Sequence, residues 1–526
     1  MKNKIYKSIL LAGLILIGFS CAKDLDTEPI DPDVISAANV FDDPANYDYV
    51  MAKLYAGLAL SGQQGPAGMG DITGIDEGFG QYLRGYWYHQ ELPTDEAVIG
   101  WNDQTIKDFH WQTWGAADVF ITAFYYRVYY QIAACNEFIR ETTDEKLNDR
   151  GVSGDLRTKI GYYRAEARWL RALSYWHALD LFGNVPFVTE EDKVGFFFPP
   201  QKSRRDLFFY VEGELKSIEG LLKDARTNDY GRADKAAAWM LLAKLYLNAE
   251  VYIGEPRYSE CITYCNKIFD AGYTLAPSYR NLFLADNDLT SKSEIIFSVN
   301  FDGVMTTTYG GTDFIVHAAV GGDMTPADYG ISGGWGGLRT TSAFVGKFDD
   351  ISGNTDVRAM FFTEGQTLEI NDIGLFNDGY AITKWKNIKS TGGPGSSLEF
   401  VDNDFPMFRL ADAYLMYAEA ILRGGSGGNQ GTALTYINDI RNRSGADPVG
   451  AIDLEFILNE RARELYWECH RRTDLVRYGY FTGSQYVWPW KGKAKDGTGT
   501  DSKYNLFPIP SSDLTANPNL TQNPGY

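Results

Sequence analysis

Apolar residues recur at steps of three and four over residues 160–182, which predicts one long amphipathic helix. Arg164, Arg168 and Arg171 fall off this apolar stripe, so we expect them on a solvated face. Gly183 follows as the residue that can close the helix in the left-handed conformation. We therefore expect this stretch to be scaffold. Its apolar stripe consists of Tyr162, Ala165, Trp169, Ala172, Leu173, Trp176 and Leu179.

The same periodicity predicts two further groups of helices, on either side of a stretch that is poor in helix signals. Residues 294–301 are the clearest strand, and residues 303–404 are rich in Gly, Thr and Asp. A glycine-rich loop is expected at 61–80. The first group of helices is predicted at 46–59, 119–140, 203–222, 233–249 and 258–269, and the second at 407–423, 432–443 and 454–478.

Two of these predicted helices carry similar segments, Tyr246–Glu250 and Tyr414–Glu419. Helix pairs joined by short turns, with alanine at the close contacts, are typical of tetratricopeptide (TPR) repeats. A strict period of about 34 residues is not visible, so the pattern is TPR-like only. The sequence thus predicts a mainly α fold, in which TPR-like helix pairs support an irregular, loop-rich ligand-binding part with a few short strands.

Composition indicates a folded protein with a strongly acidic surface. The chain has 526 residues, of which 44% are apolar, enough for a large core. It carries 49 basic and 69 acidic side chains, a formal net charge of -20. Because nucleic acids and polyanionic glycans would be repelled at long range, we expect neutral ligands and no nucleic-acid partner.

The N-terminus predicts export and lipid attachment. Residues 1–20 combine three lysines with an apolar run that is too short to span a bilayer, which indicates a signal peptide. Cys21 comes directly after small residues and suits thioether lipidation, so residues 21–40 are expected to form a lipidated tether to the membrane. An ordinary signal peptide followed by an incidental cysteine is the alternative.

The other four cysteines are expected to be buried free thiols. Cys261 and Cys265 are four residues apart on one predicted helical face, but no neighbouring His or Cys completes a metal site. Cys135 and Cys469 also lie in predicted helices.

The segment from Arg84 to Trp114 mixes aromatic rings with carboxylates and amides. Ring faces can stack on the C–H surfaces of a sugar, while polar side chains bridge its hydroxyls, so core packing and ligand contact are both open for this segment. Trp335 is flanked by four glycines in a predicted loop, which favours ligand contact.

A glycoside hydrolase would use a pair of carboxylates beside such aromatics. Asp95 and Glu96 are adjacent in sequence, and neighbouring side chains of an extended segment point to opposite faces. Patterns of the HExxH or phosphate-loop type are not present. We therefore predict a protein that is not an enzyme.

No cofactor is predicted, with calcium as the alternative. Asp286 and Asp288 could offer oxygens to Ca²⁺, with Asn287 between them. A turn rich in Asp and Asn satisfies its own backbone without a metal, and this is the favoured interpretation.

Several short motifs occur in order along nearly the whole chain. They are Glu91–Glu96 (ELPTDE), 168–183 (RWLRALSYWHALDLFG), 231–236 (GRADKA), 408–414 (FRLADAY), 418–420 (AEA), 460–464 (ERARE), 471–475 (RRTDL), 507–510 (FPIP) and 517–526 (NPNLTQNPGY). In this order they resemble the SusD/RagB family of Bacteroidetes outer-membrane nutrient-uptake lipoproteins. The charged Lys23, Asp24 and Asp26 also resemble the tag that sends such lipoproteins to the cell surface.

The resemblance implies a cell-surface protein, lipid-anchored in the outer membrane, without catalytic activity. Such proteins bind oligosaccharides and act as a hinged lid on a SusC-like TonB-dependent transporter. It also implies a helical N-terminal region over 41–275 and a C-terminal region over 276–526 that carries ligand-binding loops and the returning TPR-like helices.

Within the family the chain resembles the starch-binding branch, which implies an α-glucan ligand. The match implies stacking platforms at Tyr309 and Trp335, with Asp76 and Arg84 hydrogen-bonding sugar hydroxyls. The partner amide of that branch corresponds to Gln104. A further stacking aromatic is replaced by Ile99, for which Trp101 could substitute. An arc of rings changed by this replacement would suit a β-1,3 glucan of the laminarin type. An oligopeptide ligand is the other alternative.

Overall fold

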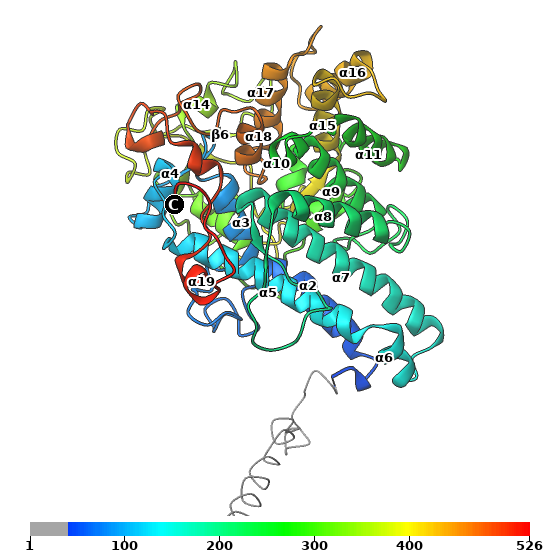
Figure 1. Ribbon diagram of the computed structural model, residues 1–526. Coiled ribbons are helices and arrows are strands. Elements are labelled where there is room, and N and C mark those ends of the chain that lie inside the picture. The colour runs from blue at the N-terminus through cyan, green and yellow to red at the C-terminus, as the bar shows by residue number, and fades with distance from the viewer. Residues whose placement is uncertain (1–39) are drawn as a thin grey trace, which may run out of the picture. The chain divides into compact units, whose positions relative to one another are not determined.

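The computed structural model describes residues 40–526, and helices dominate that part of the chain (Figure 1). The predicted lipidation at Cys21 and the tether lie outside the described residues. The helices up to residue 290 are α2 (Asn46–Ala59), α3 (Tyr82–Gln90), α4 (Gln104–Trp111), α5 (Val119–Glu141), α6 (Asp144–Asp149), α7 (Gly154–Leu181), α8 (Arg204–Ile218), α9 (Lys235–Leu247), α10 (Ala249–Ile253), α11 (Tyr258–Asp270) and α12 (Asn287–Thr290).

The later helices follow after the strand β4. They are α13 (Gly311–Ala318), α14 (Ser342–Val345), α15 (Leu410–Leu422), α16 (Gln430–Arg443), α17 (Leu454–Leu465), α18 (Arg471–Arg477) and α19 (Ser511–Ala516). Single 3₁₀ turns are η1 (Val40–Asp42), η2 (Arg280–Phe283), η3 (Pro326–Tyr329), η4 (Lys491–Lys493) and η5 (Ser502–Asn505).

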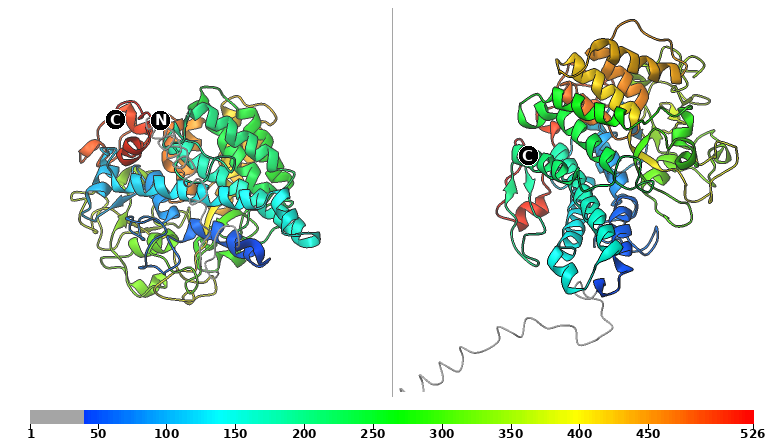
Figure 2. Two further views of the ribbon diagram at one scale, coloured as in Figure 1. Left: turned by 60° about the horizontal axis from the view of Figure 1, so that its bottom comes forward. Right: turned by 90° about the vertical axis from the view of Figure 1, so that its right-hand side faces the viewer.

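Helices stack against their neighbours as TPR-like pairs, which confirms the predicted fold class. α5 packs on α7 and α7 on α8; α9 packs on α11, α11 on α15, and α15 on both α16 and α17. The helices α9, α11, α15, α16 and α17, coloured green to orange, lie side by side in Figure 2. Much of the segment 303–404 runs as loops beside these helices.

The described strands are short and pair two by two in antiparallel fashion. β1 (Val98–Ile99) pairs with β5 (Leu338–Arg339), and β2 (Val185–Pro186) with β3 (Gln201–Lys202). β4 (Ile295–Val299) pairs with β8 (Phe405–Arg409), and β6 (Phe361–Phe362) with β7 (Ala381–Ile382). The β1–β5 pair matters for the site because it joins the segment before Trp101 to the segment after Trp335.

The long helix α7 ends where the sequence predicts. Leu181 is its last residue, and Gly183 has a φ of 74°. The solvated face predicted for all three arginines is wrong for Arg171, whose side chain is 2% exposed. Its guanidinium pairs with Glu190 and, at 2.8 Å, with Glu214 of α8. The helix therefore buries a charge that is compensated across the α7–α8 contact.

The single helix predicted over 454–478 is also wrong, because the chain breaks between α17 and α18. Trp467 and Cys469 have φ values of 60° and 67°, which are costly for residues other than glycine. The carboxylate of Glu91 compensates by accepting the backbone N–H of Cys469 at 2.6 Å and of His470 at 3.1 Å. Glu91 itself is fully buried, and burial raises its pKa to about 7.

A buried group of charges ties β8 to this break. Arg409 donates to Glu294 at 2.9 Å, to Glu464 at 2.7 Å and to Glu468 at 2.6 Å, and all four side chains are almost completely buried. Each charge is compensated by several partners, as a buried ion requires.

Residues 50–526 form one compact unit, and the boundary predicted between residues 275 and 276 stays a prediction. Among the described residues, no helix is long and apolar enough to span a membrane. Cys135, Cys261, Cys265 and Cys469 are all buried free thiols, which confirms that prediction.

Candidate functional site

Arg84 lies at the base of the candidate site because helix α3 begins just before it. The side chain of Gln81 caps this helix by accepting the N–H of Arg84 at 2.6 Å, and it also accepts the N–H of Gly311 at 3.0 Å. The cap thus joins the start of α3 to the start of α13. The Arg84 guanidinium donates to the hydroxyl of Tyr88 at 2.9 Å and to the carbonyl of Tyr309 at 2.7 Å, which fixes its position.

Phe314 of α13 is the ring on which the site is built. The Arg84 guanidinium lies 4.4 Å from the Phe314 ring centroid, and the Trp101 ring lies 6.1 Å from it in an edge arrangement. The other side of Phe314 packs on Trp87, at 5.4 Å. Because Phe314 is completely buried, it orients Arg84 and Trp101 without being available to a ligand.

The loop that carries Trp335 is held by the C-terminal end of α13. The N–H groups of Trp335, Gly336 and Gly337 donate to the carbonyls of His317, Val320 and Ala318 at 2.8, 2.9 and 2.8 Å. Carbonyls at a helix end lack partners within the helix, so this loop satisfies them. Trp335 is therefore held in place, although glycines surround it.

Close packing explains the glycines of this loop. A Cβ on Gly334 would lie 2.1 Å from the carbonyl oxygen of Val320, and one on Gly337 would lie 2.7 Å from the indole of Trp101. Gly336 has a φ of 56°, which favours glycine. The glycines thus allow the loop to lie directly against α13 and Trp101.

The imidazole of His317 packs against the indole of Trp335. The two rings stack at 5.0 Å with an angle of 22°, and the Nδ1 atom of His317 lies 2.7 Å from the carbonyl oxygen of Gly333. Burial lowers the pKa of His317, so the imidazole is neutral at pH 7. Burial also raises the pKa of Asp313, one turn earlier, well above its usual range.

Trp335 lies at the centre of three partly exposed rings, which we call the aromatic arc. Its centroid is 6.2 Å from that of Tyr309 and 6.4 Å from that of Trp101, at angles of 68° and 44°. The Trp101 indole N–H donates to the Trp335 carbonyl at 3.3 Å. Rings set at such angles present a curved surface on which successive sugar units can stack.

Asp76 lies next to Arg84 and Tyr309. Its Oδ1 atom accepts the N–H groups of Gly78 at 2.8 Å and Phe79 at 3.1 Å, which closes the glycine-rich loop. A Cβ placed on Gly78 would lie 3.0 Å from that oxygen, 3.2 Å from Arg84 and 3.9 Å from Tyr309. The structure therefore brings together Asp76, Arg84, Trp101, Tyr309 and Trp335.

Gln104 is the first residue of α4, and its amide donates to Asp108 at 3.1 Å on the exposed side of that helix. Among the described residues, no contact joins it to the other candidates. Ile99 is not part of the exposed surface of the site, because its side chain is 1% exposed in β1. Trp101, two residues later, supplies the third ring.

Most of the aromatic segment around the arc is core. Tyr86, Trp87, Tyr88 and Trp114 are buried. The same holds for both acids of the hydrolase alternative: Asp95 is bound by Arg471 at 2.7 Å, and Glu96 accepts the Trp467 backbone N–H at 3.3 Å. Both side chains lie in the interior, where a glycan cannot reach them.

In the acidic turn at 286–288, Asp286 and Asn287 bind other parts of the chain. Asp286 accepts the backbone N–H of Ser390 at 2.8 Å and its hydroxyl at 2.6 Å. The Asn287 amide donates to the carbonyls of Leu282 at 2.9 Å and Asp404 at 2.8 Å. The described residues contain no group of three or more His, Cys, Asp or Glu arranged for a metal.

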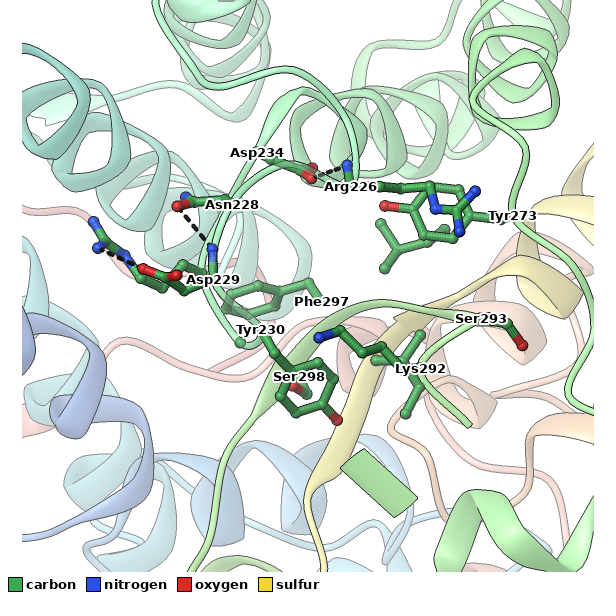
Figure 3. Close-up of a pocket in the computed structure, with 14 residues that line it drawn as sticks. Arg226, Asn228, Asp229, Tyr230, Asp234, Tyr273, Lys292, Ser293, Phe297 and Ser298 are labelled. Carbon is green, nitrogen blue, oxygen red and sulfur yellow. Dashed lines mark hydrogen bonds and ion pairs between the residues drawn. The ribbon is translucent and has the colours of Figure 1, made fainter. Parts of the chain in front are cut away.

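A cavity of about 260 Å³ lies elsewhere, between the turn 226–234 and strand β4 (Figure 3). Its carboxylates are committed: Asp234 accepts the N–H of Arg226 at 2.6 Å, and Asp229 pairs with Arg232 at 3.6 Å. The Arg226 guanidinium is bound to the carbonyl of Gly272 at 2.6 Å. None of the six predicted binding residues lines this cavity.

Sequence reasoning missed the residues that support the arc, Gln81, Phe314 and His317. Helical spacing could have placed Asp313 and His317 on one face of a helix. The contact of that face with Trp335 depends on the fold, so no local signal could have predicted it.

The model of the SusD family matches residues 367–526. The starch-binding protein SusD of Bacteroides thetaiotaomicron is 36% identical, and the alignment covers 100% of this chain and 100% of that protein. A SusD-like protein of Bacteroides ovatus is 26% identical, over 60% of this chain and 58% of its own length.

Solved structures share the fold. Surface glycan-binding protein A of Bacteroides thetaiotaomicron, in complex with laminarihexaose, has a TM-score of 0.68 and 20% identity, covering 91% of this chain and 98% of that one. A laminarin-binding SusD-like protein has a TM-score of 0.70 and 21% identity, covering 92% and 99%.

Proposed function

The chain belongs to the SusD family, and on that premise we propose that it is a surface protein that binds neutral oligosaccharides through the aromatic arc and does not cleave them. The observation that carries this proposal is the convergence of Tyr309, Trp335 and Trp101 beside Arg84 and Asp76. Partly exposed rings can stack on sugar faces, and the adjacent charged groups can bridge hydroxyls.

We propose a starch-type α-glucan as the ligand. The relative that supports this choice is named for starch binding and is 36% identical over its whole length, whereas the two neighbours linked to laminarin are only 20% and 21% identical. A β-1,3 glucan is the second candidate, because the same fold carries it in those neighbours.

The non-enzymatic role is supported by the burial of Asp95 and Glu96, the acid pair of the hydrolase alternative. A hydrolase needs two carboxyl groups that flank an accessible glycosidic bond. A peptide ligand would be expected to use charged end pockets or a strand edge rather than three rings.

Isothermal titration calorimetry of the chain from Asp24 onward, with maltoheptaose and with laminarihexaose, tests the ligand. Binding of maltoheptaose that is lost in Trp335→Ala supports the proposal, and binding of laminarihexaose alone would replace α-glucan by β-glucan. Binding of neither would refute the glucan ligand. Shorter sugars in the recovered samples would refute the non-enzymatic role.

Delivery of the bound glycan to a SusC-like TonB-dependent transporter, with Cys21 holding the protein in the outer membrane by its lipid, is the cellular role that we propose. Metabolic labelling with a palmitate analogue tests the anchor, since Cys21→Ser should remove the label. Co-purification of a TonB-dependent transporter with the tagged wild-type protein tests the partner, and its absence from solubilised membranes would refute the lid role.

A further inference from the structure

A loop from a distant part of the sequence, Ser396–Phe400, borders the aromatic arc. The carbonyl of Leu398 accepts the N–H of Ser332 at 2.8 Å, which attaches this loop to the one that carries Trp335. The ring of Phe400 lies 5.6 Å from that of Tyr309. Glu399 lies between Leu398 and Phe400, so these two contacts place it beside the rings of Tyr309 and Trp335.

Glu399 is exposed, and no basic side chain pairs with it in the described part of the chain. Its backbone N–H donates to the hydroxyl of Ser397 at 3.1 Å, which orders the loop at this point. Burial raises the pKa of Tyr309, and the negative charge of Glu399 raises that pKa further, as expected for a nearby carboxylate.

The other polar groups of the arc are partly committed to the protein. Arg84 uses two of its five donors on Tyr88 and Tyr309, and Asp76 uses one oxygen on two backbone N–H groups. A glycan that stacks on Tyr309 and Trp335 exposes its hydroxyls at the edges of the rings. Glu399 offers an exposed carboxylate at that position. Its interaction with the Tyr309 hydroxyl uses one of about four lone pairs, and a carboxylate accepts hydroxyl hydrogen bonds more strongly than a neutral oxygen does.

We propose that Glu399 contacts the glycan, accepting hydroxyls beside Tyr309 and Trp335 and excluding sugars that carry a negative charge. This inference rests on the proposed glycan-binding function of the arc. Asp76 and Glu399 place two carboxylates around the arc against one cation, Arg84, so the charge beside the rings is negative overall. A uronic acid unit on the rings would be repelled, so the site selects by repulsion as well as by attraction.

The experiment compares the wild-type chain with Glu399→Gln in calorimetric titrations. The ligands are the neutral glucan that the wild type binds and the same glucan oxidised at C6 to carry carboxylates, each at low and at high salt. Glu191→Gln is the matched control, because Glu191 is also an exposed glutamate, in the loop after β2, and has no ion pair in the described structure. Trp335→Ala reports on the arc itself.

We expect Glu399→Gln to bind the neutral glucan about fivefold more weakly, because a neutral acceptor replaces a charged one. The preference for the neutral over the oxidised glucan should fall about fivefold at low salt and less at high salt. Glu191→Gln should change neither quantity. Melting temperatures equal to that of the wild type would exclude a folding defect at these exposed positions.

Two outcomes would overturn the inference, and they are distinguishable. If Glu399→Gln keeps both the affinity and the preference while Trp335→Ala loses binding, Glu399 has no role and the glycan-binding function stands. If the wild type binds neither maltoheptaose nor laminarihexaose, the proposed function fails and the role of Glu399 fails with it.

Discussion

Gly337→Ala should weaken glycan binding by displacing one ring of the arc. A Cβ at this position would lie 2.7 Å from Cε2 and 2.8 Å from Nε1 of Trp101. Non-bonded carbon atoms prefer about 3.5–4.0 Å, so the indole must move by about 1 Å. That movement breaks the hydrogen bond from the Trp101 indole to the Trp335 carbonyl, which is 3.3 Å long.

The size of the effect follows from the ring face that the sugar would lose. A stacked indole covers about 50 Å² of sugar surface, which at about 25 cal/mol per Å² is worth about 1 kcal/mol. We therefore expect the dissociation constant to rise about five- to eightfold. The added methyl group also overpacks the loop, so the free energy of unfolding should fall by about 1–3 kcal/mol.

Calorimetric titration and differential scanning calorimetry measure the two effects separately. Gly333→Ala is the matched control in the same loop, because a Cβ there would meet no atom within 4 Å. It should leave both the affinity and the melting temperature unchanged. If Gly337→Ala binds glycan as tightly as Gly333→Ala does, Trp101 is not a platform of the arc and the reasoning is refuted.

Two further predictions concern stability. Glu91 has a pKa raised to about 7 by burial, so its contribution to stability is lost as pH rises from about 4.5 through 7. Glu91→Gln should therefore gain stability relative to the wild type over that window, by up to about 3 kcal/mol, and an equal difference in unfolding free energy at pH 5 and pH 8 would contradict this. Arg409→Ala removes the guanidinium that three buried carboxylates share and leaves each with fewer cationic partners, so it should cost about 3–5 kcal/mol in urea unfolding. Arg205→Ala, which removes the exposed pair with Glu255, should cost less than about 1 kcal/mol, and similar losses in the two variants would refute the role of the buried group.

Local sequence signals predicted the helices well wherever periodicity and an end signal coincide. The helix that stops before Gly183 is one example, and the start of the helix predicted from residue 203 is another, since the Ser203 hydroxyl accepts the N–H of Asp206 at 3.0 Å. The break between α17 and α18 escaped prediction because Trp467 and Cys469, rather than glycines, adopt left-handed conformations there. The compensating group, Glu91, lies more than 370 residues away in sequence.

The arc shows the same division. Trp335 could be selected from the sequence because a large ring among glycines has little reason to be core. The residues that support Trp335 could not be selected, because Phe314 and His317 look like ordinary residues of an apolar helix. Only the packing of α13 against the Trp335 loop gives them a role. The burial of Ile99 could not be predicted either, because its inward orientation in β1 depends on pairing with β5.

A crystal structure of the chain with bound maltoheptaose tests the central claim most directly. Successive glucose rings should lie against Tyr309, Trp335 and Trp101, with hydroxyls within hydrogen-bond distance of Arg84 and Asp76. A glucan bound instead in the cavity between the turn 226–234 and β4, with the arc left free, would contradict the account.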